Sequence, residues 1–203
     1  MKLYDGGRAA NPRRVRIFLA EKRITVPTEE VDIGTLAHRT AAYAAINPMQ
    51  RLPALMLDDG TVIAESMAIC RYFEALHPDP PMFGAGALES ALVEMWNRRV
   101  ELLLLLPVTT VFQHLHPYMK AMVDPQVPAW GEANKPRVID FLSFLDGELK
   151  DRSFIAGEHF SVADITALVA VDFMKVSRLA VPDDLQNVRR WHSAVAARPS
   201  AKA

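Results

Sequence analysis

A predicted helix start near the N-terminus carries groups suited to hold an anion. Pro12 opens the helix, the side-chain amide of Asn11 is a further donor, and Arg8, Arg13 and Arg14 bring positive charge close by. Unpaired N–H groups and the dipole of a helix start favour negative charge, and with nearby cations they lower the pKa of a thiol. We therefore expect this start to hold an anion, with Asn11 as N-cap, as an auxiliary donor, or as both.

A second helix start, at Glu65 and Ser66, offers donors for an anion and a carboxylate beside them. The Ser66 hydroxyl and backbone N–H groups would bind a carboxylate, and the Glu65 carboxylate would pair with an amine. A plain capping pair is the structural alternative. Farther along the chain, Ser161 and Asp164 form a capping box ahead of an apolar run, which indicates a structural helix start without a chemical role.

The single cysteine, Cys70, limits the possible redox and metal chemistry. One cysteine excludes an internal disulfide, a CxxC pair and a cysteine-rich zinc site, and this favours a reducing, cytoplasmic compartment. Because Cys70 lies among Met67, Ile69 and Phe73 at helical spacing, we expect a buried, inert thiol rather than a nucleophile.

Charge and hydropathy exclude several other classes of function. The 203 residues include 23 basic and 24 acidic side chains, so no overall field favours nucleic acid or an anionic membrane. The N-terminus lacks the apolar core of a signal peptide. The most apolar stretch, 100–112, is shorter than the roughly 20 residues that a membrane span needs. It also contains Glu101 and Pro107, so we expect a buried helix kinked at Pro107.

The elements that position these groups follow the order βαβαββα over the first 80 or so residues. Periodicity and turn signals define them, with Asp58, Asp59 and Gly60 as a hairpin turn and Asn47 and Pro48 closing an irregular, alanine-rich helix. The strands are expected at 2–5, 27–33, 54–57 and 61–63, and the helices from Pro12, at 36–46 and at 65–76.

A proline-rich stretch, 77–84, separates these elements from a part without convincing strands. We therefore predict a thioredoxin-like domain over residues 1–81 and an all-helical domain over residues 86–203. The helices of the second domain are expected at about 87–107, 109–122, 129–151, 161–177 and 182–197.

This order of elements, together with several motifs, resembles the cytosolic glutathione transferases over essentially the whole chain. The motifs are Lys-Leu-Tyr-Asp at 2–5, Asn-Pro-Arg-Arg-Val-Arg-Ile from Asn11, Asn47-Pro48 ahead of Leu52-Pro53, the run from Ala64 to Tyr72, and the capping box. Two stretches are most similar to the yeast-type atypical subgroup of the family and its bacterial relatives. They are the run Asn-Pro-Arg-Arg-Val-Arg-Ile from Asn11 and residues 112–117.

The resemblance implies a site for glutathione as co-substrate. It implies a cis peptide bond before Pro53, with the backbone of Leu52 pairing with the cysteinyl amide, and γ-glutamyl recognition by Glu65 and Ser66. For the glycine carboxylate it implies His38, with Arg51 as a second cation; a solvated surface role is the alternative for both. Two positions depart from the family pattern, because Gln50 and Arg23 stand where relatives carry glycine, and the first puts the loop at the glycine end in doubt.

The resemblance also shows what is missing. Family members place a Tyr, Ser or Cys in the loop before the first helix, whereas the loop from Asp5 to Pro12 has none, and Tyr4 lies in a strand where packing is the favoured role. This leaves the helix start and Asn11 as the catalytic groups. The atypical subgroup uses a water held by a histidine and a serine of the helical domain; both His114 and His116 are candidates for the histidine, and the sequence shows no evident serine partner. With Phe112 the two histidines form the expected substrate pocket, which Trp96, Val108, Tyr118 and Trp130 would extend.

The function implied is conjugation of the glutathione thiolate to hydrophobic electrophiles, a detoxifying transferase activity. A glutathione-dependent peroxidase or thiol transferase is one alternative, and a non-catalytic binding module of the same fold is another. Family members are commonly homodimers, and Met49, Arg71 and Arg99 are candidates for that contact.

Overall fold

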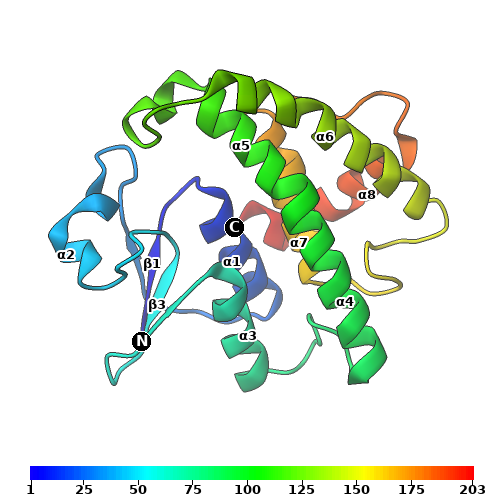
Figure 1. Cartoon of the computed structure of the whole chain (residues 1–203). Helices are drawn as coiled ribbons and strands as arrows, with labels where there is room; N and C mark the ends of the chain where they lie inside the picture. The colour runs from blue at the N-terminus through cyan, green and yellow to red at the C-terminus, as the bar shows by residue number, and fades with distance from the viewer. The chain divides into compact units, whose positions relative to one another are not determined.

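The computed structural model describes residues 1–203 and divides into two compact units (Figure 1). Unit 1 comprises Met1–Met82 together with Pro199–Ala203, and unit 2 comprises Phe83–Arg198. The division falls within the proline-rich stretch. No helix has both the length and the apolar character needed to cross a bilayer.

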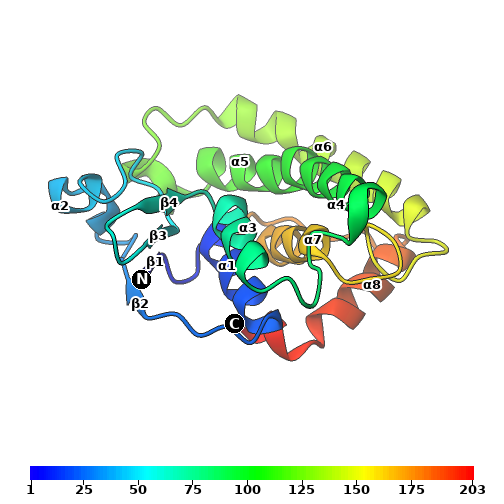
Figure 2. The same ribbon diagram turned by 90° about the horizontal axis from the view of Figure 1, so that it is seen from below.

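Unit 1 is a four-stranded mixed sheet with helices on both faces. The strand order is β2-β1-β3-β4, with β1 parallel to β2 and antiparallel to β3, so the predicted thioredoxin-like order is confirmed. Helices α1 and α3 lie side by side (Figure 2), whereas Tyr43 of α2 packs with Tyr4 and Val31 in a separate cluster. The elements are β1 Lys2–Asp5, α1 Ala10–Glu21, β2 Thr28–Glu30, η1 Ala37–Arg39, α2 Ala41–Ala44, β3 Ala54–Met56, β4 Val62–Ala64, α3 Ser66–Leu76 and η4 Pro199–Lys202.

Local signals in the sequence explain the turns of unit 1. Gly60 has φ +86° in the β3–β4 hairpin, as the Asp-Asp-Gly turn predicted. At the end of α1, Arg23 takes φ +55°, and the N–H of Ile24 donates to the carbonyl of Leu19 at 2.9 Å. This is the bonding of a Schellman end, which glycine usually provides at the position of Arg23.

The C-terminal segment was expected to belong to the helical domain, and for Pro199–Ala203 that expectation is wrong. These residues pack on α1 of unit 1. Arg13 donates to the carbonyl of Ala201 at 2.9 Å, and the Ser200 hydroxyl bonds to Glu21. Hydrogen bonds to α1 at both positions bring the end of the chain back to the first unit.

Unit 2 is all-helical, as predicted, around the central helix α7. Every residue of α7 from Val162 to Val171 is buried. The predicted capping box is present: the Ser161 hydroxyl accepts from the N–H of Ala163, and the Asp164 carboxylate accepts from the N–H of Ser161 at 3.0 Å. The helices are α4 Gly86–Val100, η2 Glu101–Leu105, α5 Leu106–Leu115, η3 Pro117–Ala121, α6 Pro128–Glu148, α7 Val162–Met174 and α8 Gln186–Ala196.

Pro107 marks a change of helix type in unit 2. The five residues before α5, Glu101–Leu105, form a π-helical turn between α4 and α5. Proline lacks an N–H and its ring clashes with the carbonyl four residues earlier, so a widened turn is one way to accommodate it. The predicted kink is thus a local widening, and the hydroxyls of Thr109 and Thr110 donate to the carbonyls of Leu105 and Leu106 in the next turn.

Candidate functional site

The start of α1 presents backbone donors that no side chain caps. Its N-cap is Ala9, in an extended conformation with φ −67° and ψ 147°, and the first helical bond runs from the N–H of Arg13 to the carbonyl of Ala9. The N–H groups of Ala10 and Asn11 therefore remain available, while Pro12 has none. The expectation that Asn11 caps the helix is wrong, because α1 begins one residue before it.

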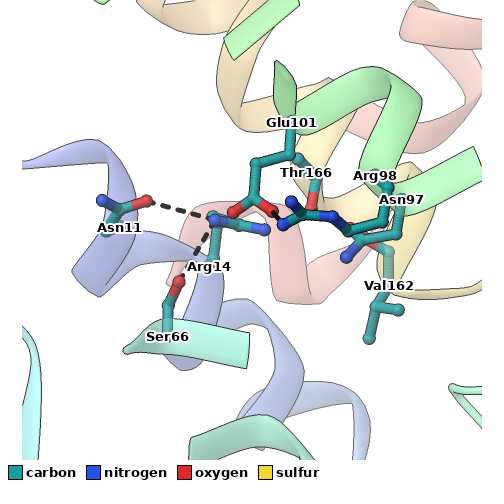
Figure 3. A network of polar contacts seen from close by, with 8 residues as sticks. All are labelled: Asn11, Arg14, Ser66, Asn97, Arg98, Glu101, Val162 and Thr166. Atoms are coloured by element: carbon teal, nitrogen blue, oxygen red, sulfur yellow. Dashed lines mark hydrogen bonds and ion pairs between the residues drawn. The ribbon is translucent and has the colours of Figure 1, made fainter. Parts of the chain in front are cut away.

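Asn11 nevertheless joins a polar chain that links the two predicted helix starts. One nitrogen of Arg14, a buried side chain, donates to Asn11 Oδ1 at 3.2 Å and to Ser66 Oγ at 3.1 Å (Figure 3). Because its oxygen accepts from Arg14, the Asn11 amide leaves its N–H₂ group to donate elsewhere. The Ser66 hydroxyl likewise keeps its own proton for an acceptor.

Glu65 and Ser66 form the start of α3, as predicted. Glu65 is the N-cap with φ +69° and ψ 122°, a conformation that costs a residue with a side chain about 1–3 kcal/mol and is concentrated at functional sites. Ser66 is the first residue of the helix and is buried. A carboxylate placed here would meet the Ser66 hydroxyl and the N–H groups of a helix start.

The loop before β3 has the features that the resemblance implied. The peptide bond between Leu52 and Pro53 is cis, as expected. The carbonyl of the preceding residue, Arg51, accepts from the Tyr43 hydroxyl and from Asn47 Nδ2, both at 2.8 Å. Burial raises the pKa of Tyr43 to about 12, so this phenol stays a donor. Two side chains of the preceding segment therefore fix the loop that offers the backbone of Leu52.

His38 lies in η1 and is 7% exposed. Its Nδ1 atom is enclosed and has no hydrogen-bond partner. Burial lowers the pKa of His38, and the charges of Arg39 and Arg51 lower it further, so the neutral form of this ring is favoured and Arg51 is the cation of the predicted pair. A buried polar atom without a partner costs free energy, and a bound carboxylate between His38 and Arg51 would offset that cost.

Gln50 adopts the left-handed conformation that glycine usually supplies, with φ +54°. Its N–H donates to the carbonyl of Asn47 at 2.8 Å. The loop thus keeps a left-handed residue at this position despite the substitution, at the conformational cost of a side chain there.

Two other residues considered from the sequence are confirmed as part of the packing. Tyr4 is buried and makes an edge contact with Tyr43, with ring centroids 6.1 Å apart. Cys70 is fully buried, and burial raises the pKa of its thiol to about 12. A thiol with that pKa is not ionised near neutral pH.

In unit 2, the structure brings together Phe112 and His116 but not His114. The rings of Phe112 and His116 are 4.9 Å apart, and His116 Nδ1 accepts from the N–H of Tyr118 at 3.2 Å. His114 turns to another segment, where its Nδ1 accepts from the N–H of Val127 at 3.1 Å. A ring whose Nδ1 accepts carries its proton on Nε2, so each neutral histidine retains one donor.

Of the residues expected to extend the pocket, two belong to the core of unit 2. Val108 is fully buried, and Trp96 is 3% exposed and stacks on Phe144. Trp96 lies on α4 and Val108 on α5, and both side chains face the interior of unit 2. Tyr118 and Trp130 are about half exposed.

Sequence reasoning missed the roles of Arg14 and Tyr43. Arg14 was counted only as nearby charge, although its spacing of three residues from Asn11 allowed the contact along the helix. Tyr43 had been assigned to an irregular helix without a role. Only the fold brings either side chain to its distant partner, Ser66 for Arg14 and Arg51 for Tyr43.

Comparison with known families matches both parts of the chain. Residues 10–76 match the N-terminal domain of glutathione S-transferases, and residues 113–199 match the C-terminal domain of the same family. The first match contains the two helix starts and the cis-proline loop, and the second contains His114, His116 and the capping box.

Individual relatives extend over the whole chain. Glutathione S-transferase 2 of Saccharomyces cerevisiae is 35% identical, over 100% of this chain and 88% of that protein. The crystal structure of Gtt2 from the same yeast has a TM-score of 0.94 at 35% identity, and covers 100% of this chain and 99% of that one. A glutathione S-transferase domain-containing protein of Marinobacter aquaeolei has a TM-score of 0.94 at 37% identity, and covers 98% of this chain and 99% of that one.

These matches agree with the geometry of unit 1 and favour an enzyme over a non-catalytic module of the same fold. The chain therefore belongs to the glutathione S-transferase family, as a transferase that uses glutathione as its co-substrate.

Proposed function

We propose that this transferase conjugates the glutathione thiolate to hydrophobic, planar electrophiles, and that backbone N–H groups at the start of α1 stabilise the thiolate in place of a side-chain hydroxyl. The observation that carries the proposal is the uncapped start of α1, where the N–H groups of Ala10 and Asn11 have no side-chain acceptor. The preceding loop contains no Tyr, Ser, Thr or Cys.

The remaining groups would hold the rest of glutathione around that sulfur. Glu65 and Ser66 would bind the γ-glutamyl end, the backbone of Leu52 ahead of Pro53 would pair with the cysteinyl amide, and His38 with Arg51 would bind the glycine carboxylate. The chain from Asn11 through Arg14 to Ser66 supports this assignment, because it links the sulfur position to the γ-glutamyl position.

The reaction needs little further acid or base catalysis. Ionisation of bound glutathione releases the thiol proton to solvent, and the thiolate then attacks the electrophilic carbon. A carbon–sulfur bond forms, and the leaving group, such as chloride from a chlorinated nitroaromatic, departs with the bonding electrons. The contribution of α1 is to hold the thiolate by oriented dipoles.

The thiolate proposal is tested by replacing Ala10 with proline. Ala10 is the first residue of α1, where proline is tolerated, and the extended Ala9 before it suits a pre-proline position. Ala10→Pro removes one of the two N–H donors, so we expect the pKa of bound glutathione, measured by its ultraviolet thiolate absorbance, to rise by roughly one unit. Ala10→Gly keeps the N–H and serves as the control. An unchanged pKa in Ala10→Pro, or a parent value equal to that of free glutathione, would contradict the proposal.

On unit 2, we propose that Phe112 and His116 contact the electrophile and that His114 does not. The paired rings of Phe112 and His116 and the Nε2 donor support this, while His114 is engaged with Val127. With a chlorinated dinitrobenzene, Phe112→Leu and His116→Ala should lower kcat/KM several-fold and His114→Ala should not. Equal effects of the two histidine substitutions would count against the assignment.

We also propose that the enzyme is a homodimer and that unit 2 contributes an apolar face to it. A groove of about 480 Å³ on this unit is lined by Leu103, Phe141 and Phe144 with Arg99, Arg137 and Asp140. Of its apolar residues, Leu103 and Phe144 are each more than 40% exposed, and so are Leu102 and Leu106 in the neighbouring turns. A face that carries both arginine and aspartate is complementary to a second copy of itself across a two-fold axis.

The dimer is tested by measuring the molar mass of the Leu103→Asp variant by light scattering. We expect a monomer, while Leu88→Asp, which alters a 75% exposed leucine in the first turn of α4, should stay dimeric. A Leu103→Asp protein with the parent mass would rule out this face. A detoxifying role follows from the proposed conjugation, and a cytoplasmic location is proposed from the single cysteine.

A further inference from the structure

The outer edge of the sheet in unit 1 is open at β2. Strand β2 is the last in the order β2-β1-β3-β4 (Figure 2), and its three residues are all exposed. Pro27 accepts from the N–H of Leu3, and Val31 donates to the carbonyl of Asp5. Residues alternate along a strand, so the N–H and C=O groups of Thr28 and Glu30 point away from β1, toward an edge with no further strand.

A groove of about 370 Å³ runs beside this edge. Its apolar surface comes from Val31, Tyr43 and Ile46, of which the first two are buried. Glu29, Glu30 and Asp32, all exposed, also line it, and the Glu30 carboxylate lies beside Gly7, on the face of the strand opposite to Val31.

The carboxylates of this strand and of the residue after Val31 are only partly neutralised. Glu29 forms an ion pair with Lys2 at 2.9 Å, but both side chains are about half exposed, so that pair is weak. Asp32 accepts from the N–H of Gly34, a neutral donor. The groove therefore combines an apolar floor, unpaired strand groups and negative charge.

We propose that this groove binds an extended, basic segment of a partner protein, which adds to β2 as a further strand. Backbone pairing with Thr28 and Glu30 would align the segment, apolar side chains would enter the groove, and alternate lysine or arginine side chains would meet the carboxylates. A second copy of this chain is a poor occupant, because pairing of β2 with itself would oppose glutamates of like charge. Nucleic acid is disfavoured because its phosphates would be repelled by the carboxylates of Glu29, Glu30 and Asp32.

The proposal is tested with a synthetic peptide of alternating lysine or arginine and valine. Added to the ¹⁵N-labelled full-length protein, it should bind saturably with a Kd below about 1 mM. The shifted amide signals should map to residues 28–32 and 37–46. No saturation, or shifts that map elsewhere, would overturn the proposal.

Matched variants separate a built site from simple charge attraction. Glu29→Gln/Glu30→Gln should weaken binding at least fivefold, whereas Asp151→Asn/Glu158→Gln removes the same charge from exposed positions of unit 2 and should change it less than twofold. A peptide N-methylated at alternate residues should lose binding, because it cannot pair with the strand. Equal loss in the two double variants, or unchanged binding of the methylated peptide, would refute strand addition. Glutathione turnover should be unaffected by either double variant.

Discussion

The starts of α1 and α7 differ in how their free backbone N–H groups are satisfied. Both present backbone N–H groups with positive partial charge. At α7 the Ser161 hydroxyl and the Asp164 carboxylate satisfy them, and Asp164 accepts further bonds from the N–H of Ile155 and from Trp191 Nε1, both at 2.9 Å. At α1 the N-cap is an alanine, and no side chain caps the donors, which we propose hold the thiolate. A capped start stabilises the fold, and an uncapped one beside other polar groups can bind a substrate.

A third start, that of α8, adds an intermediate case. Its N-cap, Leu185, offers no side-chain acceptor. Instead the Asp146 carboxylate, on α6, accepts from the N–H groups of Asn187 and Val188 at 2.8 and 2.9 Å. An uncapped N-cap residue therefore does not by itself indicate a binding site, since a distant side chain can supply the anion.

The largest expected effect is at the capped start. Asp164→Ala would leave buried donors at Ile155, Ser161 and Trp191 without acceptors, so we expect a loss of about 3–5 kcal/mol in the free energy of unfolding, more than a single cap contributes. Asn11→Ala, at the uncapped start, should change the free energy of unfolding by less than about 0.5 kcal/mol. Denaturant titration measures both. Similar losses in the two variants would remove the distinction between these helix starts.

The next largest effect is the pH dependence of the contribution that Asp164 makes to the free energy of unfolding. Burial raises the pKa of Asp164 to about 6, although its four hydrogen bonds lower it. The folded protein then holds the proton more tightly than the unfolded chain, so stability is greatest below the ordinary value of 3.8 and falls as pH rises through 6. Relative to Asp164→Asn, which does not titrate, the parent should lose about 2 kcal/mol between pH 4.5 and 7.5. A difference independent of pH would mean that the four donors keep this carboxylate ionised.

A smaller effect is expected at the binding start of α3. Ser66→Ala removes a hydroxyl that would donate to the γ-glutamyl carboxylate, and it also removes an acceptor of Arg14. We expect the Kd for glutathione to rise about tenfold by calorimetry, since a hydrogen bond to a charged group contributes about 1.5 kcal/mol or more. Ser143→Ala, on an exposed face of α6, is the control. An unchanged Kd would remove Ser66 from the proposed site.

The smallest effect concerns the loop at the glycine end. Gln50→Gly should raise the free energy of unfolding by about 0.5–1 kcal/mol, because glycine has no steric cost at φ +54° but leaves the unfolded chain more flexible. Affinity for glutathione should be retained, since the side chain of Gln50 is not part of the proposed contacts. A tenfold loss of affinity would show that glutamine contributes more than backbone geometry.

The sequence was sufficient wherever a signal was local. The Asp-Asp-Gly turn, the Ser161–Asp164 box and the order of elements in unit 1 each follow from neighbouring residues, and the cis bond at Pro53 followed from the family motif. Three other features depend on contacts between distant segments. These are the bond from Arg14 to Ser66, the cap that Asp146 provides for α8, and the return of Pro199–Ala203 to unit 1. No periodicity in the chain encodes such pairings.

The helix register of Asn11 shows how a small boundary error changes a chemical role. The presence of Pro12 suggested a start at that residue, but α1 begins at Ala10. A shift of two residues turns Asn11 from a cap into a residue of the first turn, with its amide oxygen engaged by Arg14. Which N–H groups face a ligand therefore depends on a boundary that sequence patterns define only within a few residues.

The packing of Pro199–Ala203 on α1 bears on how the chain folds during synthesis. Met1–Met82 is translated before the helical unit, whereas Pro199–Ala203 is translated after it. The contact between Pro199–Ala203 and α1 therefore cannot form until the helical unit has been synthesised, and part of α1 is uncovered until then. Truncation of the last five residues should impair the first unit rather than the one to which they are joined in sequence.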